Sequence, residues 1–396
     1  MNKKDIAAIR RQFKVDNDLL TISHIFNVYI RKESSEIYHE EIRPFQVLER
    51  EQQELFLTNF KKVLTGKPDV KLFDVKFERE PDTYTENHAQ DLLFEGLQAD
   101  EAEDWKEAML DLAEKMVKDR QYDKDLVVTF IRGEFFKPTK KHGGDAEIEE
   151  RDEVFTHKFV LCSLNVTEEP KKAIAFDYIE KAFKSNVIVD PIINLASPIG
   201  GFLYPSFTDS ASDVNHVLYA AGKPNQPDVH FIEEVLNGSD IITAQEDKAV
   251  FEEIVKQVAG DELDTPTISN VYEEINRLME DEEDDEEQIQ TLDSRTVEKV
   301  LRASGIADVD TEKVQAAFQT VIDDEKYELK ASNVVPNYNT KSIKIKTKVA
   351  DIAISPQDLR YVRQINFNGR RCLLIEVEED TMIEGFKLIE EETLRI

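Results

Sequence analysis

Cysteine is almost absent from this chain of 396 residues, which contains only Cys162 and Cys372. Each lies in an apolar, strand-like run, so we expect buried free thiols in a reducing compartment rather than a disulfide. No apolar run approaches the roughly 18 residues that a membrane span needs, and residues 1–6 lack the apolar core of a signal peptide. We therefore expect a cytoplasmic protein that has no membrane partner.

Catalytic motifs are also missing. Residues 197–201 (Ser-Pro-Ile-Gly-Gly) lack the Lys-Ser/Thr that a phosphate-binding loop needs, and His39-Glu40-Glu41 lacks the second histidine of a zinc motif. His24 and His39 can face each other across a first hairpin, but ordinary strand histidines are the favoured interpretation. We therefore predict no catalytic, cofactor or metal residues and no cofactor.

An enzyme whose site is assembled only by the fold remains an alternative. A cleft that gathers several scattered side chains would favour it. The candidates for such a cleft are His157, His216, Asp209 and Asp213.

Positive charge is scarce, and the formal net charge is -32. Such a charge repels nucleic acid and anionic membranes at long range and suits a basic partner. Eight consecutive acids occupy residues 280–287, where mutual repulsion and the lack of apolar side chains predict a solvated segment, either a frayed helix end or a linker. This acidic octet lacks the alternating ligands and the glycine of a calcium loop.

Hydrophobic periodicity indicates an α+β protein. Alternation predicts strands over 21–30, 36–42, 70–77, 126–136, 154–166, 342–354, 361–367 and 371–377, with a tight turn at Asn368-Gly369. Helical spacing predicts helices over 5–14, 47–64, 87–97, 102–117, 212–221, 229–236, 244–258, 265–279, 294–303 and 311–322.

These elements suggest three segments. Residues 1–225 form a mixed sheet-and-helix domain, and residues 226–290 form a helical segment that ends in the acidic linker. Residues 291–396 form a small helical hairpin followed by a β-sheet unit. The hairpin has the length of a helix-turn-helix, but its second helix carries few side chains that could contact DNA bases. A structural role is therefore favoured.

Residues 192–227 are rich in proline, glycine and aromatic side chains. A loop this apolar either packs on the core or forms part of a surface groove. We interpret Phe202, Tyr204 and Phe207 as a contact surface for a protein partner.

A basic segment, residues 337–371, carries a net charge of +6 in this acidic chain. The candidate nucleic-acid-binding residues are Lys344, Lys346, Lys348, Arg360, Arg363, Arg370 and Arg371. A period of two places the three lysines on one face of a strand. Three roles compete: protection of a sheet edge from aggregation, binding of a phosphate backbone, and docking of the acidic octet or the acidic C-terminal tail.

Several motifs are distributed along the chain: Met-Asn-Lys-Lys-Asp-Ile at residues 1–6, Ile-Arg-Arg-Gln-Phe-Lys at 9–14, Gly-Phe-Leu-Tyr-Pro at 201–205, Leu218-Tyr219, and the strand after 368–370. Through them the chain resembles, over nearly its whole length, a family of uncharacterised bacterial proteins of unknown function. The resemblance implies no activity. A more distant similarity, of element order and length alone, is to the bacterial nucleoid-associated protein family, and the net charge opposes it.

Together these features favour a non-enzymatic cytoplasmic binding protein with an unknown protein partner. Nucleic-acid association through the basic sheet is the alternative, and homo-oligomer formation stays open. If the octet screens the basic face, its deletion should strengthen the binding of polyanions.

Overall fold

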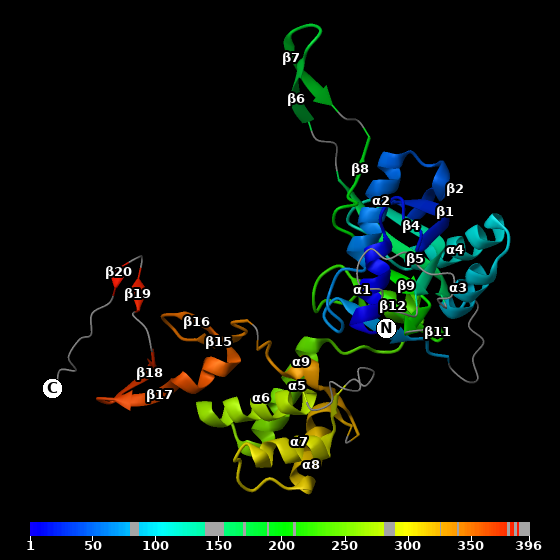
Figure 1. Cartoon of the computed structure of the whole chain (residues 1–396). Coiled ribbons are helices and arrows are strands. Elements are labelled where there is room, and N and C mark those ends of the chain that lie inside the picture. The colour runs from blue at the N-terminus through cyan, green and yellow to red at the C-terminus, as the bar shows by residue number, and fades with distance from the viewer. Residues whose placement is uncertain are drawn as a thin grey trace. The chain divides into compact units, whose positions relative to one another are not determined.

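The computed structural model describes residues 1–79, 87–138, 154–168, 172–187, 190–208, 211–280, 290–324, 326–338, 340–377, 381–383 and 386–387. It confirms the α+β class, with a large antiparallel sheet in the first half, helices next and small hairpins last (Figure 1). The chain forms two compact units, Met1–Thr243 and Ala244–Ile396.

Unit 1 is built on an antiparallel sheet whose strand order is β2-β1-β4-β5-β9-β12-β3, with β8 paired to β5. The strands are β1 (Leu20–Arg31), β2 (Glu36–Pro44), β3 (Leu72–Lys76), β4 (Leu126–Pro138), β5 (Val154–Glu168), β8 (Ile192–Ile193), β9 (Gly200–Tyr204) and β12 (His216–Ala221). The predicted hairpins β1–β2 and β4–β5 are both present.

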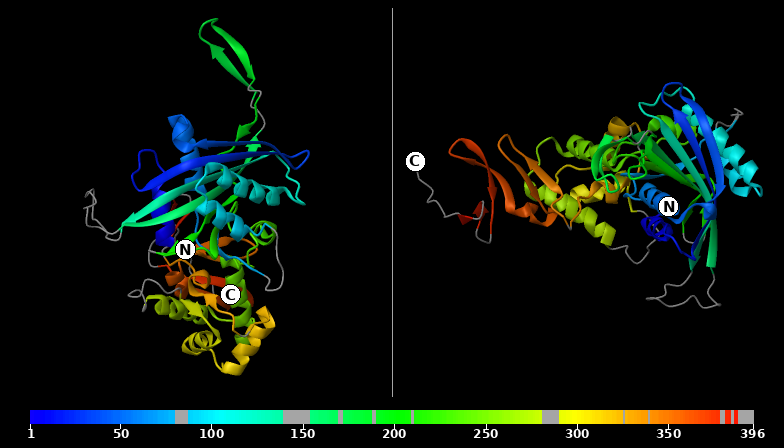
Figure 2. Two further views of the ribbon diagram at one scale, coloured as in Figure 1. Left: turned by 90° about the vertical axis from the view of Figure 1, so that its right-hand side faces the viewer. Right: turned by 90° about the horizontal axis from the view of Figure 1, so that it is seen from above.

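Helices cover both faces of this sheet. They are α1 (Lys3–Gln12), α2 (Arg50–Val63), α3 (Ala89–Gln98), α4 (Ala102–Val117), the short helix η1 (Phe45–Val47) and the π-helix η2 (Phe231–Val235). Phe26 and Val28 of β1 pack in the core formed with α3, α4 and η2, whereas Ile25 packs in the core formed with α1 and α2. Figure 2 shows α3 and α4, in cyan, along one face. Strands that are buried on both faces lose the polar positions that mark alternation.

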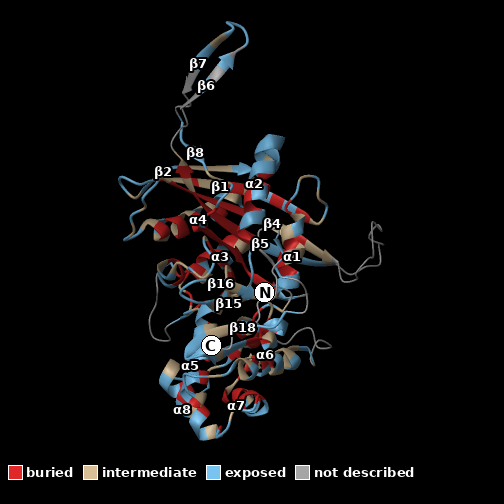
Figure 3. Ribbon diagram, turned by 90° about the vertical axis from the view of Figure 1, so that its left-hand side faces the viewer, coloured by how far each residue is buried: buried red, intermediate tan, exposed pale blue. Residues whose placement is uncertain are grey.

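Two further hairpins belong to unit 1. One joins β6 (Lys172–Asp177) to β7 (Ala182–Val187), and the other joins β10 (Ser206–Thr208) to β11 (Ala211–Asp213). Figure 3 shows the tip of the β6–β7 hairpin in the colour of exposed residues, in contrast to the buried strands of the main sheet.

Unit 2 begins with helices that share one apolar core. They are α5 (Ala244–Ala259), α6 (Thr265–Glu280), α7 (Ser294–Ala303), α8 (Thr311–Ile322) and α9 (Ala331–Val334), with the strand pair β13 (Thr291–Leu292) and β14 (Leu329–Lys330). The carboxylates of Asp293 and Asp310 cap α7 and α8 by accepting backbone N–H bonds from Thr296 and Lys313, both at 2.8 Å. Such caps fix where a helix begins.

The rest of unit 2 consists of small ribbons. They are β15 (Ile343–Lys346) with β16 (Asp351–Ile354), β17 (Val362–Phe367) with β18 (Arg370–Ile375), and β19 (Met382–Ile383) with β20 (Phe386–Lys387); helix η3 (Pro356–Tyr361) precedes β17. Asn368 and Gly369 form the turn between β17 and β18 with φ of 51° and 77°. The predicted tight turn is thereby confirmed, because two positive φ values are typical of a type I′ hairpin.

The structure differs from the sequence-based expectations at three places. The single strand expected over 342–354 is a hairpin of two strands, β15 and β16. Residues 212–221 are not a helix: they form part of β11 and all of β12, whose side chains are buried on both sides. Helices α5 and α6 share a core with α7 and α8, so the chain divides after Thr243 rather than near residues 225 and 290. Within the acidic octet, residue 280 ends α6, and residues 281–287 lie outside the described residues.

Among the residues described, no helix has the length and apolarity required to cross a membrane.

Candidate functional site

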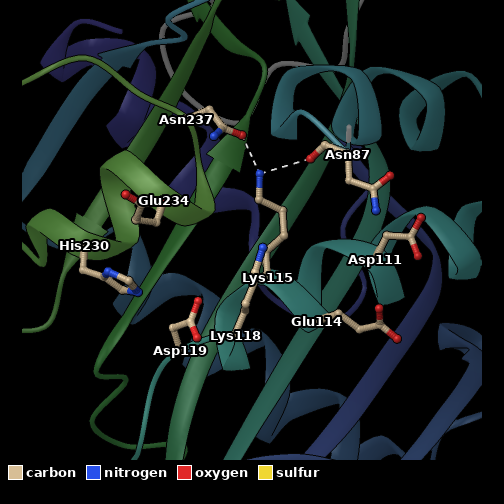
Figure 4. Close-up of a pocket in the computed structure, with 9 residues that line it drawn as sticks. All are labelled: Asn87, Asp111, Glu114, Lys115, Lys118, Asp119, His230, Glu234 and Asn237. Atoms are coloured by element: carbon tan, nitrogen blue, oxygen red, sulfur yellow. Dashed lines mark hydrogen bonds between the residues drawn. The ribbon is translucent and has the colours of Figure 1, made fainter. Parts of the chain in front are cut away.

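A pocket of about 750 Å³ in unit 1 gathers titratable side chains around Lys115 of α4 (Figure 4). Its walls come from the start of α3, the second half of α4 and the segment that carries η2. The lining residues are Asn87, Asp111, Glu114, Lys115, Lys118, Asp119, His230, Glu234 and Asn237.

The helical period of α4 places Lys115 in this pocket. Trp105, Met109, Leu112 and Met116 are buried on one face of the helix, as their spacing predicted. Lys115 precedes Met116 and lies at the border of this face, so its aliphatic stem is half-buried while its amine reaches the pocket.

The Lys115 amine is held by two oxygen atoms. Its Nζ donates to the backbone carbonyl of Asn87 at 3.0 Å and to Oδ1 of Asn237 at 2.5 Å. The same Oδ1 accepts the backbone N–H of Ala89 at 3.0 Å, so Asn237 connects α3, α4 and the end of η2. Asn87 and Asn237 have φ of 57° and 50°, a left-handed conformation that asparagine tolerates better than most residues.

Burial lets the amine of Lys115 lose its proton more easily than the amine of an ordinary lysine. Burial lowers the pKa of Lys115 to about 8; the nearby Glu234 opposes this shift by favouring the ammonium form, and the charge of Lys118 adds to it. The π-helix η2 carries Glu234 and follows His230, and single π-turns occur frequently at functional sites. The arrangement therefore presents a lysine that is partly deprotonated near neutral pH, next to groups that can transfer protons.

The three aromatic residues predicted as a contact surface are core residues. Phe202 and Tyr204 are 0% exposed and Phe207 is 1% exposed, so the expectation that they form a surface is wrong. Phe202 and Tyr204 belong to β9, a strand in the middle of the sheet. A Cβ at the preceding Gly201 would lie 2.3 Å from the carbonyl oxygen of Cys162, so glycine is needed for the close approach of β9 to β5.

Among the described histidine and aspartate candidates, the two histidines bond to different side chains. His157 is buried, stacks on Phe207 with centroids 4.5 Å apart, and lies 2.9 Å from the Ser212 hydroxyl. His216 bonds instead to the Asp213 carboxylate at 2.6 Å. Asp209 lies outside the described residues.

His24 and His39 do not face each other, which excludes the disfavoured alternative of a histidine pair across the first hairpin. In the β1–β2 hairpin His24 is opposite Pro44, and His39 is opposite Tyr29. Among the described residues no group of three or more histidine, cysteine, aspartate or glutamate side chains is arranged to hold a metal ion.

The seven basic candidates are all exposed, but they are distributed over separate ribbons. Lys344 and Lys346 share one face of β15, as predicted, whereas Lys348 lies in the turn that follows. In the β17–β18 ribbon Arg370 and Arg371 are adjacent in one strand and therefore point to opposite faces. Arg363 lies 3.6 Å from the Glu376 carboxylate, and the remaining candidate, Arg360, donates to the Tyr361 hydroxyl at 3.0 Å.

An exposed apolar hairpin, β6–β7, was not identified from the sequence. The exposed fractions are 77% for Ile174, 41% for Phe176, 85% for Tyr178, 94% for Ile179 and 79% for Phe183. The signal was present in the period-of-two spacing of Ile174, Phe176 and Tyr178, which is typical of a strand. We call this hairpin, residues 172–187, the apolar arm.

A family model described as a domain of unknown function, DUF4317, matches residues 1–386, so the chain belongs to that family. The match confirms the predicted membership of a full-length family of unknown function. It gives no support to the more distant similarity to nucleoid-associated proteins. No curated protein matches the chain.

Proposed function

Since the family has no assigned activity, we propose that the protein is a binding protein whose apolar arm docks in an apolar groove of a different protein. The observation that carries this proposal is the exposure of five large apolar side chains on one hairpin. Apolar surface concentrated in one place is typical of an interaction site, whereas single exposed apolar residues are common on any protein.

The energetics suit a docking segment. Burial of a large apolar side chain contributes about 1.5–3 kcal/mol, so burial of Tyr178, Ile179 and Phe183 contributes about 5 kcal/mol or more. That gain is comparable with the lower end of the cost of association, about 4–15 kcal/mol, so a specific complex also needs contacts beyond these three side chains. A two-stranded hairpin is marginally stable alone in water, so a partner would also stabilise the arm.

Charge indicates the chemistry of the partner. The arm contains three lysines and two acids in a chain whose net charge is -32. Lys181 and Lys184 are exposed beside the apolar tip, and Lys184 lies 2.6 Å from the Glu180 carboxylate. A groove rimmed by carboxylates complements this tip, and a neutral or basic surface around that groove avoids repulsion by the rest of the chain. The strongly negative remainder of the chain opposes the approach of a second copy and of an anionic membrane.

Site-specific photo-crosslinking in the native cell tests the proposal. A photo-reactive residue replaces Ile179 in the arm, and in a matched control it replaces Leu55, a similarly aliphatic residue that is 58% exposed on α2. We expect position 179 to crosslink to an apolar segment of one different protein, and position 55 to give no such product. The purified partner should bind the wild-type chain but not a Tyr178→Ser/Ile179→Ser/Phe183→Ser variant.

Three results would contradict the proposal. They are equal crosslinking from positions 179 and 55, crosslinks only to other copies of the chain, and arm-dependent binding to vesicles of anionic lipid in place of a protein. Mass spectrometry identifies the crosslinked proteins, sedimentation detects association between copies of the chain, and flotation detects binding to vesicles.

Polyanion association is a second candidate function, and the exposure of all seven basic candidates supports it. Lys344 and Lys346 lie on one face of a two-stranded ribbon, opposite Ala353 and Asp351. A pair of lysines on one face can follow a phosphate backbone. Lys344 and Arg363 line one pocket of unit 2, but Glu252, Asp261, Glu262 and Asp264 line it too, and these acids weaken its attraction for phosphate.

A further inference from the structure

We propose that Lys115 is a nucleophilic amine that forms an imine with a small aldehyde or ketone that carries no anionic group. This inference is independent of the docking function of the apolar arm, which lies elsewhere in unit 1 and uses none of the same residues.

The hydrogen bonds of Lys115 orient the amine for attack. An uncharged lysine amine has two N–H groups and one lone pair. The carbonyl oxygen of Asn87 and Oδ1 of Asn237 accept two N–H bonds, at 3.0 and 2.5 Å. In Figure 4 the two hydrogen bonds leave Nζ in different directions, toward Asn237 and toward Asn87, so the lone pair of the uncharged amine occupies the remaining tetrahedral position.

The pocket provides room for a substrate. Its volume of about 750 Å³ falls in the range of small-molecule sites. The acceptors come from segments far apart in the sequence, with Asn87 before α3 and Asn237 after η2, so the position of the amine depends on the folded chain. A lysine on an open helix surface would lack both constraints.

The charges that face Lys115 select the carbonyl compound. Asp111, Glu114, Lys118 and Asp119 lie on α4 or just after it, and His230 and Glu234 lie on the facing segment. Four carboxylates against two lysines leave the lining negative, which disfavours a substrate with a carboxylate or phosphate. An uncharged or cationic carbonyl compound avoids this repulsion.

The step is a condensation without redox change. The Nζ lone pair forms a bond to the carbonyl carbon, and the π electrons of the C=O bond move to oxygen. The nitrogen loses its two protons, the oxygen gains two, and water leaves as the C=N bond forms. His230 and Glu234 are the titratable groups on the facing wall that can carry these protons.

Reductive labelling tests the assignment on the full-length chain. The protein is treated with propionaldehyde and cyanoborohydride at pH 7.5, and the labelling rate of each lysine is measured by peptide mass spectrometry. Lys118, an exposed lysine in the same pocket, is the internal control. We expect Lys115 to react about tenfold faster than Lys118, with a rate that levels off above about pH 8, because an ordinary lysine is almost fully protonated at pH 7.5.

Two further measurements distinguish a site that selects its carbonyl compound from a lysine that reacts only because it is accessible. Glyoxylate, an anionic aldehyde, should lose most of the preference for Lys115. Asn237→Asp, which keeps the shape of the side chain and adds a negative charge beside Nζ, should slow labelling of Lys115 and leave Lys118 unchanged. The proposal is overturned if Lys115 reacts no faster than Lys118 with propionaldehyde, or if glyoxylate shows the same preference.

Discussion

Phe176 and Phe183 are directly opposite each other in the β6–β7 hairpin, and their ring centroids lie 5.2 Å apart in an edge-to-face arrangement. The rings nevertheless remain 41% and 79% exposed. Phe176 also contacts the ring of Tyr178 at 5.2 Å. The apolar arm thus has a small aromatic cluster that holds its two strands in register but covers little of its own surface, which leaves most of that surface available to a partner.

Removing apolar side chains from the arm should weaken partner binding and leave the free energy of unfolding of unit 1 nearly unchanged. Ile179→Ser with Phe183→Ser replaces two side chains that are 94% and 79% exposed. We expect the free energy of unfolding to change by less than about 0.5 kcal/mol, because exposed positions contribute little to a core. Chemical denaturation measures this change, and Val47→Ser with Leu55→Ser on the surface of unit 1 is the matched control.

The opposite result is expected for Phe202. Its ring is fully buried in the core that β9 shares with α3 and α4. Phe202→Ala should lower the free energy of unfolding by about 3–5 kcal/mol, through the lost burial and the cavity that remains. Thermal and denaturant unfolding provide the measurement. A loss below about 1 kcal/mol would mean that the ring is accessible, as the sequence first suggested.

The aromatic side chains of the apolar arm are exposed, whereas Phe202 and its neighbours are buried. The sequence predicted the burial of the second group wrongly. Residues 192–227 are rich in proline, glycine and aromatic residues, which is typical of a loop. They supply two strands, β9 and β12, that are buried on both faces, so neither strand shows the alternation of polar and apolar residues that marks a half-buried strand. The composition of a segment does not reveal that helices cover both faces of its strands.

Part of β1 and the helices were easier to predict. Residues 26–31 of β1 alternate between buried and more exposed side chains, and α4 has one buried face and one polar face, so both periods are visible in the sequence. The Lys115 pocket could not be predicted in the same way. Asn87, Lys115 and Asn237 are separated by long stretches of sequence, and only the fold brings the two acceptors to the amine.

The lowered pKa of Lys115 predicts a specific pH dependence of stability. The pKa is about 8 in the folded chain and 10.5 for an ordinary lysine, so the unfolded chain binds more protons between these values. The contribution of Lys115 to the free energy of unfolding should therefore increase from pH 8 to 10.5 and be constant below about pH 7. Other groups titrate in this range, so the quantity to measure is the difference between the wild type and Lys115→Met.

For that variant, the stability deficit relative to the wild type should grow as the pH rises from 8 to 10.5. Lys118→Met is the control, because Lys118 is exposed and lines the same pocket. A constant difference between wild type and Lys115→Met across this range would show that the amine titrates normally.

The exposed lysines of β15 predict how any polyanion binding depends on salt. If Lys344 and Lys346 contact phosphates, the logarithm of the affinity should fall linearly with the logarithm of salt concentration. Lys344→Glu with Lys346→Glu should weaken binding and reduce the slope by about 2. Fluorescence anisotropy with single-stranded DNA measures both, and Lys299→Glu with Lys313→Glu on the helices of unit 2 is the charge-matched control.

The acidic octet can be tested with the same DNA-binding measurement. Deletion of residues 281–287 leaves α6 intact and removes seven negative charges from the chain segment between α6 and α7. If these acids screen the basic ribbons, the deletion should strengthen DNA binding at low salt, and the gain should disappear as salt shortens the range of the repulsion. A substitution of the seven acids by serine and glycine of equal length separates charge from linker length. Unchanged affinity in both variants, with binding by the wild type, would make the octet a spacer with no electrostatic role in binding.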